Sequence, residues 1–310
     1  MIKWSGFFAV LAIAALITAC SSHSRYDIHQ ELFAKAVDTT TLLPLPTSTT
    51  PDYRIKLINE EMLLPSNQKR FKGFEAVPQD FDDFRFNNLD GVQWQNVSVR
   101  YGDFRGVSFR TAIANGSNFS YADFRLADLR WSSFNNTTMR HCNFAQAVLF
   151  RTAMNEALLD SSDFRGSNMF GVKGNRSSFR HADFSNALMK ESELTDADFS
   201  NSKAIKVKFI ITVFAGSRFD SVDYSYSDFT GAGLEACSFV HSRLHGVNFK
   251  GAHLQEASFV GADLKGTDFF AAELVDTDFS DAINIPKDLL PFIGENGKAT
   301  GVVFRINPDE

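Results

Sequence analysis

The feature that most restricts the fold of this sequence is a five-residue period that runs through residues 82–281. Every fifth residue from Phe84 to Phe279 belongs to one unbroken register of 40 positions, called here the central positions. Phe, Leu, Met, Tyr or Trp occupies 36 of them, and Phe alone occupies 20. Two residues before each central position, from Val92 to Thr277, all 38 residues are Ala, Ser, Thr, Cys, Val or Gly. One large and one small side chain therefore recur in every five residues.

This period matches neither the 3.6-residue period of an α-helix nor the two-residue period of a flat strand. A chain can satisfy it by turning a corner after every five residues, so that the large and the small side chain both point inward. Four such sides close one coil, and successive coils stack by parallel strand pairing at about 4.8 Å. The period therefore predicts an all-β solenoid that is a single domain whatever its length.

Three runs carry the motif most clearly: YADFRLADLR (121–130), HADFSNALMKESELTDADFSNS (181–202) and GAHLQEASFVGADLKGTDFFAAEL (251–274). They resemble the A(D/N)(L/F)XX signature of pentapeptide repeat proteins, and the resemblance covers about two thirds of the chain. It implies a right-handed quadrilateral parallel β-helix of about ten coils. In that fold the central Phe or Leu and the preceding Ala or Ser fill the interior.

A few central positions are small, and they mark expected irregularities in the solenoid. Ala114, Gly174 and Ala204 are candidate weak points or bulges. The segment GVKGNRSS (171–178) contains two glycines, and we expect it to bend or to form a loop.

The N-terminal segment of the chain indicates export. Residues 1–19 read as a signal peptide, because their apolar run is too short for a spanning helix. The segment Ile17-Thr18-Ala19-Cys20 resembles a bacterial lipobox. That resemblance implies that Cys20 is lipidated and that the protein is anchored in the cell envelope, with Ser21 favouring the outer membrane. An ordinary secretory signal peptide with an incidental Cys20 is the alternative.

The segments that flank the repeat have other compositions. Residues 20–50 are rich in Ser and Thr and indicate a flexible tether. Residues 51–81 indicate an N-terminal capping segment with a short helix, and residues 282–310 leave the register and indicate a C-terminal cap. Caps are expected because an open solenoid end exposes apolar surface and unpaired strand edges. A dimer contact is the alternative interpretation of the C-terminal tail.

Cysteines and histidines offer little chemistry. Cys142 and Cys237 occupy small inward positions on different sides of distant coils, so we expect two buried, unpaired thiols. His241, His245 and His253 form a loose cluster near the C-terminal end. Exposed, solvated histidines are the favoured interpretation of this cluster, and a zinc site is the alternative. We predict no metal and no cofactor.

Charged residues recur at the spacing of one coil. Four Asp-Phe-Arg triplets are expected to form an Asp column and an Arg column on one side of the solenoid. The arginines are a candidate surface for anionic lipid head groups or a glycan. The favoured interpretation is that the two columns neutralise each other as a solvated face. The four arginines are Arg85, Arg105, Arg125 and Arg165.

Apolar residues also recur where outward-facing positions are expected. Phe150, Phe170 and Ile210 share one column, and Ile205 and Ile211 lie near it. Contiguous apolar surface usually marks an interface, so these five residues form a second candidate interaction surface. The alternative is that a segment within residues 21–80 folds over them.

The sequence favours a non-enzymatic envelope lipoprotein that acts as a rod-like binding or scaffolding module. Its expected partners are the membrane, through the lipid, and a protein or envelope polymer; a homodimer is possible. One alternative is a DNA-mimicking, gyrase-binding member of the family. The export signal and the basic residues 81–180, 12 basic against 9 acidic, disfavour it, and no nucleic acid partner is expected.

A β-helix enzyme that acts on polysaccharide is a further alternative. Acidic pairs such as Asp223 with Asp228 and Asp263 with Asp268 are present, but they recur with the repeat signature itself. A catalytic pair is expected once, flanked by insertions that build a cleft, and the register contains none.

Overall fold

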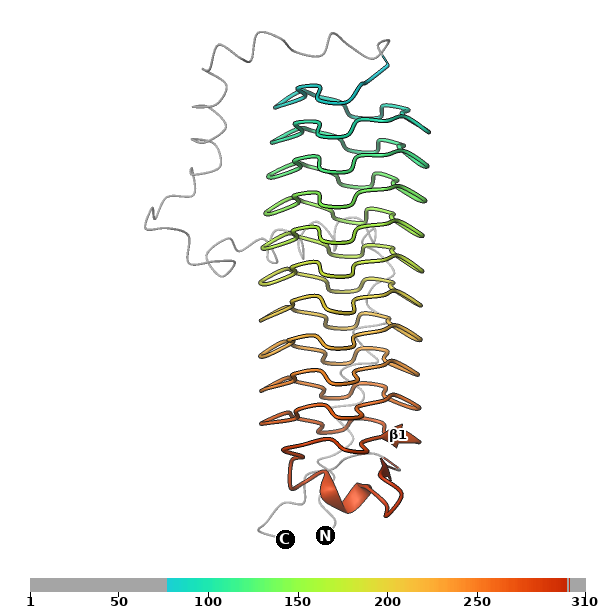
Figure 1. Cartoon of the computed structure of the whole chain (residues 1–310), viewed down its shortest axis with the longest axis vertical. Helices are drawn as coiled ribbons and strands as arrows, with labels where there is room; N and C mark the ends of the chain where they lie inside the picture. Colours follow the sequence, from blue (N-terminus) through green and yellow to red (C-terminus); the bar gives the residue numbers. More distant parts are fainter. Residues whose placement is uncertain (1–76, 300, 302–310) are drawn as a thin grey trace, which may run out of the picture. The chain divides into compact units, whose positions relative to one another are not determined.

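The computed structural model describes residues 77–299 and 301 (Figure 1). The predicted signal peptide, the tether, the helix expected after residue 51 and residues 302–310 therefore lie outside the described residues. Among the described residues, no helix has the length and apolar character needed to cross a membrane.

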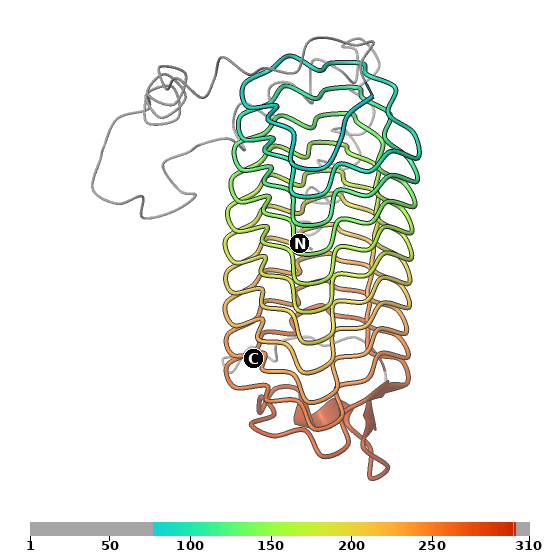
Figure 2. The same ribbon diagram turned by 45° about the horizontal axis from the view of Figure 1, so that its top comes forward.

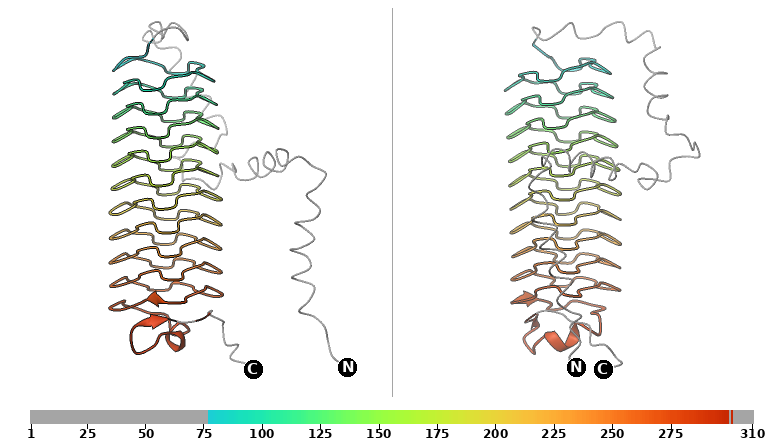
Figure 3. Two further views of the ribbon diagram at one scale, coloured as in Figure 1. Left: turned by 90° about the vertical axis from the view of Figure 1, so that its right-hand side faces the viewer. Right: turned by 180° about the vertical axis from the view of Figure 1, so that it is seen from behind.

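Residues 81–283 form a stack of similar coils (Figures 1 and 2). Parallel bridges join every fifth residue to the equivalent residue of the next coil, as Asp83 to Asp103, so each coil has four paired sides. The first four bridges start at Asp83, Asn88, Gln93 and Ser98, and the last joins Asp263 to Ile283. This is the pairing that the five-residue period predicts, and it continues without interruption from Asp83 to Ile283. Figure 3 shows the regular succession of coils that it joins.

Aromatic rings fill the interior in vertical stacks. The central side chains are almost fully buried, and in one column six phenylalanines follow one another at coil spacing. Their ring centroids are 4.5 Å apart from Phe84 to Phe104 and 5.0 Å apart from Phe164 to Phe184. Stacked rings add favourable energy beyond the area that they bury, so the phenylalanines specify the alignment of successive coils.

Most hydroxyl groups and both thiols at the small inward positions bind the backbone of the preceding coil. The Ser162 hydroxyl donates a hydrogen bond to the carbonyl of Met139 (2.8 Å) and accepts one from the N–H of Cys142 (3.1 Å). Such a hydroxyl is satisfied inside the core, which explains why Ser and Thr are tolerated beside Ala at these positions; Ser167 and Ser202 are exceptions without a partner.

The two inward cysteines follow the same rule. The thiol of Cys142 donates to the carbonyl of Phe119 (3.0 Å), and that of Cys237 donates to the carbonyl of Phe214 (3.1 Å). Both cysteines are buried and unpaired, as predicted. Burial raises the pKa of both thiols far above the usual value.

Where Asp or Asn precedes a central position, its side chain commonly accepts the N–H of the residue that follows that position. Examples are Asp183 with the N–H of Ser185 (2.9 Å) and Asn143 with that of Ala145 (3.0 Å). On one side of the stack, the acceptor comes from the neighbouring coil. There the side chain of an asparagine accepts the backbone N–H of the equivalent residue in the next coil, as Asn135 does for Asn155 (2.9 Å). The signature therefore places an acceptor where the turn leaves a backbone donor without a partner.

The second residue after each central position generally lies in the left-handed backbone region, for example Tyr121 at φ 64° and Trp131 at φ 58°. Glycine is required there only where a neighbour takes the space of a side chain. At Gly106, an added Cβ would lie 2.4 Å from the ring of Phe86 in the preceding coil.

The irregularities expected at small central positions are absent from the backbone of the described coils, so the predicted bend or loop at residues 171–178 is wrong. Lys173 and Ser178 form the regular parallel bridges, and neighbouring side chains fill the space at Gly174. An added Cβ there would lie 2.8 Å from Leu194 Cδ2. Side chains of adjacent coils thus compensate for a missing one.

At the C-terminal end the chain leaves the register and covers the last coil. Strand β1 (Thr277–Asp278) pairs antiparallel with β2 (Lys298–Ala299), and the short 3-10 helix η3 (Leu290–Phe292) lies between them in sequence. Leu289 is fully buried, and Ile293 packs against the core. The apolar end of the stack is therefore shielded from water.

Candidate interaction surfaces

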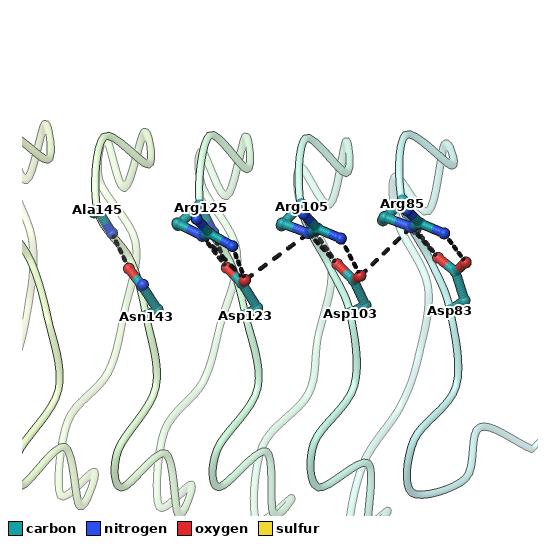
Figure 4. A network of polar contacts seen from close by, with 8 residues as sticks. All are labelled: Asp83, Arg85, Asp103, Arg105, Asp123, Arg125, Asn143 and Ala145. Carbon is teal, nitrogen blue, oxygen red and sulfur yellow. Dashed lines mark hydrogen bonds and ion pairs between the residues drawn. The ribbon is translucent and has the colours of Figure 1, made fainter. Parts of the chain in front are cut away.

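The Asp-Phe-Arg triplets form an ordered ladder on one side of the N-terminal coils (Figure 4). In each triplet the arginine binds the carboxylate two residues before it, for example Arg105 Nη2 to Asp103 Oδ2 at 2.7 Å and Arg125 Nη2 to Asp123 Oδ2 at 2.6 Å. The arginines also reach the next coil, since Arg85 Nε lies 3.4 Å from Asp103 Oδ2. The side chains of the first three triplets thus form one alternating chain of charges.

Exposure increases along this ladder. The side chain of Arg85 is 9% exposed, that of Arg105 25%, that of Arg125 46% and that of Arg165 58%. Asn143 and Ala145 follow the third triplet and interrupt the ladder (Figure 4). The fourth triplet, with Asp163 and Arg165, lies one coil further on. All four predicted arginines are therefore in ion pairs with their own triplet, and only the last two present much guanidinium surface to a partner.

The ladder should make stability depend on pH. Burial acts to raise the pKa of Asp83, but hydrogen bonds from Arg85 outweigh it and hold the pKa below its usual value of 3.8. A carboxyl whose pKa is lowered by folding adds stability above its usual pKa and loses it as the pH falls through the folded value. We expect the urea midpoint of unfolding to fall between pH 7 and pH 3.

The Asp83→Asn variant is the control for this prediction. Its amide keeps an acceptor for the N–H of Arg85, as Asn143 does for Ala145, but does not titrate. We expect it to lose less stability on acidification than the wild type. Equal losses in both proteins would show that Asp83 does not contribute.

An exposed aromatic stack runs beside the ladder, and sequence reasoning missed it. The ring centroids of Phe81, Tyr101, Tyr121 and His141 follow one another at 4.8 Å, with interplanar angles of 4°, 8° and 9°. The four lie 20 residues apart, and Tyr101, Tyr121 and His141 occupy the second position after a central residue in successive coils. This spacing of aromatic residues, one coil apart at an outward position, could have predicted the stack from the sequence. Because the rings cover one another's faces, the stack presents ring edges and two phenol groups outward.

The apolar column differs from its prediction. Phe150 and Phe170 are 5% and 6% exposed and stack on each other at 5.4 Å, so the expectation that they face solvent is wrong. The ring of Trp131 packs edge-on against Phe150, and the Arg151 guanidinium lies over the Phe150 ring. The two phenylalanines are therefore covered by each other and by side chains of neighbouring turns.

The isoleucines are divided between two corners of the coil. Ile205 and Ile210 are half-buried and occupy different corners, whereas Ile211 is 61% exposed. Val213, on the adjacent side, is also exposed. The exposed apolar surface of this segment is thus centred on Ile211 and Val213.

The C-terminal histidines pair separately with carboxylates. His245 Nε2 lies 2.6 Å from Asp263 Oδ2, and His253 Nδ1 lies 3.1 Å from Glu273 Oε2. Within residues 77–299, no three His, Cys, Asp or Glu side chains are placed to hold a metal ion.

The acidic pairs considered for catalysis serve the turns instead. Asp223 accepts hydrogen bonds from the N–H (3.0 Å) and hydroxyl (2.6 Å) of Ser225, and Asp228 accepts the same two from Thr230 (3.0 and 2.6 Å). These are the acceptor positions of the repeat. Their presence therefore needs no catalytic explanation.

A polar cavity of about 210 Å³ opens between the coils on another side. Its guanidinium, carboxylate and hydroxyl groups offer both donors and acceptors, which suits a small polar group of a sugar or an anion. The lining residues are Arg180, Asp198, Ser200, Asn201, Arg218, Asp220 and Ser221.

Comparisons with known proteins identify the repeat. A family model described as a pentapeptide repeat region matches residues 172–249. A second, described as pentapeptide repeats (8 copies), matches residues 95–130, 127–166 and 248–283. Together the two models span more than half of the chain. No curated protein matches it.

Two solved structures illustrate the similarity. QnrB1, a plasmid-mediated fluoroquinolone resistance protein, in a trypsin-treated form, is 19% identical over 70% of this chain and 93% of its own, with a TM-score of 0.41. HetL of the cyanobacterium Nostoc sp. strain PCC 7120, a pentapeptide repeat protein involved in heterocyst differentiation regulation, is 20% identical over 61% and 87%, with a TM-score of 0.32. From the family models, the chain belongs to the pentapeptide repeat family.

Proposed function

We propose that this protein is a non-catalytic, rod-like binding module of the bacterial cell envelope, anchored in the outer membrane through lipid on Cys20. Its repeat is proposed to be a right-handed quadrilateral β-helix of about ten coils. The observation that carries the binding role is the ordered array of outward side chains on successive coils, above all the Asp–Arg ladder and the aromatic stack beside it. A protein or an envelope polymer would engage several coils at once.

The chemistry of the described coils supports binding rather than catalysis. Their carboxylates accept backbone N–H groups of the turns or pair with basic side chains, and interior hydroxyls such as that of Ser162 bind backbone carbonyls. The exposed arginines Arg125 and Arg165 and the phenols of Tyr101 and Tyr121 offer hydrogen bonds to an elongated partner.

Membrane fractionation of the wild type beside Cys20→Ala tests the anchor. We expect metabolic lipid labelling of the wild type and its sedimentation with outer membrane, and we expect Cys20→Ala to lose both. Cys142→Ala is the matched control, because that thiol is buried in the coils and should leave labelling unchanged. A surface-protease test then decides the orientation. A wild type that stays cytoplasmic and unlabelled would overturn the proposal and make a gyrase-binding assay the next experiment.

A further inference from the structure

One outward column of the C-terminal coils is self-complementary. Parallel bridges connect its six residues, one from each successive coil. The first residue of the column is basic and the sixth is acidic. The second is acidic and the fifth is a histidine, and the third is an exposed apolar residue where the fourth is a glycine. The residues of this column, called here column 173–273, are Lys173, Glu193, Val213, Gly233, His253 and Glu273.

At the centre of this column, exposed apolar side chains form a ridge, and glycines in the next coil leave a flat area beside it, called here the shelf. Val213 is 43% exposed, and Ile211, on the neighbouring corner of the same coil, is 61% exposed. The next coil has Gly231 and Gly233 at the corresponding positions. A Cβ added at Gly231 would meet only Ile211, at 3.7 Å, and one added at Gly233 would meet only the Glu235 carboxylate. Two exposed apolar side chains thus adjoin two positions that lack a side chain.

We propose that two copies of this chain associate antiparallel through column 173–273. A two-fold axis perpendicular to the stack, placed between the coils of Val213 and Gly233, sets the column opposite itself in reversed order. Val213 of each copy then packs over Gly233 of the other, and Ile211 packs over Gly231. The contact is isologous and closed, so it ends at a dimer.

The same axis aligns the charges favourably. Lys173 of one copy lies opposite Glu273 of the other, and Glu193 lies opposite His253. Within one chain Lys173 pairs with Glu193 (3.3 Å) and His253 with Glu273 (3.1 Å). All four side chains remain 42 to 56% exposed, so they can bind a second copy without breaking these pairs. In the dimer they form two four-residue clusters.

The dimer is weak. Six coils at about 4.8 Å extend over roughly 24 Å of one narrow side, so the contact buries less than the area of about 800 Å² per partner that is usual in stable complexes. Lys190 and Lys250, at the corner of the coil, also face each other in this arrangement and oppose association. The inference depends on the coils alone and is independent of the lipid anchor.

Disulfide trapping tests the register. In the full-length chain with Cys20→Ala, Glu193→Cys and His253→Cys lie three coils apart, about 14 Å, too far for a bond within one chain, which needs about 7 Å. In the proposed dimer each new cysteine faces the other kind in the second copy. We expect mild oxidation to give a covalent dimer from the double variant. The buried thiols of Cys142 and Cys237 stay unreactive.

The single variants are the controls. Two copies of Cys at position 193, or two at position 253, are also about 14 Å apart in the antiparallel dimer, so neither single variant should cross-link efficiently. Single variants that cross-link as well as the double variant would indicate parallel or random contact. That result, or no dimer from the double variant, overturns the proposal.

Sedimentation velocity gives an independent test, because it measures dimer formation without introduced cysteines. Gly233 does not have a positive φ, so Gly233→Leu fills the shelf without backbone strain. We expect at least a tenfold weaker dimer with an unchanged melting temperature. Ser238→Leu, on another side where Leu158 already occupies the same column, should dimerise like the wild type. Unchanged association of Gly233→Leu would contradict the proposed contact.

Discussion

Replacing Phe184 with Asp is expected to abolish cooperative folding of the coils around it. Phe184 is fully buried, and its ring centroid lies 5.0 Å from that of Phe164 and 5.5 Å from those of Phe179 and Phe199. A carboxylate there would have neither water nor a partner. An unpaired buried charge and the lost ring packing together cost more than about 4 kcal/mol.

The position of Phe184 in the middle of the stack increases the effect. Each coil contacts only its neighbours, so a failed coil separates the coils above it from those below. Urea unfolding followed by circular dichroism should show a lost or divided transition and poor solubility. Phe184→Leu is the matched control, since Leu244 and Leu264 already occupy this column, and it should cost about 1 to 2 kcal/mol. A soluble Phe184→Asp protein with a wild-type transition would contradict the buried central position.

The second large effect is expected from overfilling a small inward position. Ala187 is 2% exposed and lies between the central residues Phe184 and Met189. The interior accepts one large side chain on each side of a coil, because the rings of adjacent coils already contact one another. Ala187→Phe should therefore force off-rotamer side chains or separate two coils, at a cost of about 3 kcal/mol.

Thermal unfolding of Ala187→Phe beside Ala187→Ser checks this prediction. Serine occupies the same column at Ser167 and Ser227, and the Ser227 hydroxyl donates to the carbonyl of Ala204 (2.5 Å). The buried Ser167 hydroxyl, by contrast, has no partner, so the column tolerates serine with or without this bond, and Ala187→Ser should cost about 1 kcal/mol or less. If Phe at this position melts at the wild-type temperature, the small inward positions are not sterically restricted.

One buried polar group in the stack, the hydroxyl of Tyr224, lacks a hydrogen-bond partner. Tyr224 is a fully buried central residue that follows the small Ala204 in its column, and burial raises its pKa well above the usual value. Its hydroxyl lies near Ser202, but neither oxygen makes a hydrogen bond of normal geometry. The space left by Ala204 thus accommodates the larger ring at the expense of an unsatisfied hydroxyl.

The sequence by itself determined the interior of this protein. The central and small positions were assigned from their period, and the burial of Phe184, Ala187 and Cys142 follows from those assignments. The four-sided coil and its parallel pairing were also predictable. The physical reason is local: five residues that place one large and one small side chain inward leave the backbone few alternatives.

The outer surface was decided only by the tertiary structure. Phe150 and Phe170 were expected to face solvent but stack against each other, and Gly174 was expected to bend the chain but keeps the regular bridge pattern. The left-handed turn residues were equally hidden. Neutralisation of the Arg column by the Asp column was expected, but the sequence did not show that each arginine pairs within its own triplet. An outward side chain is placed by its neighbours in the coils before and after its own, and the five-residue period carries no information about how those side chains fit together.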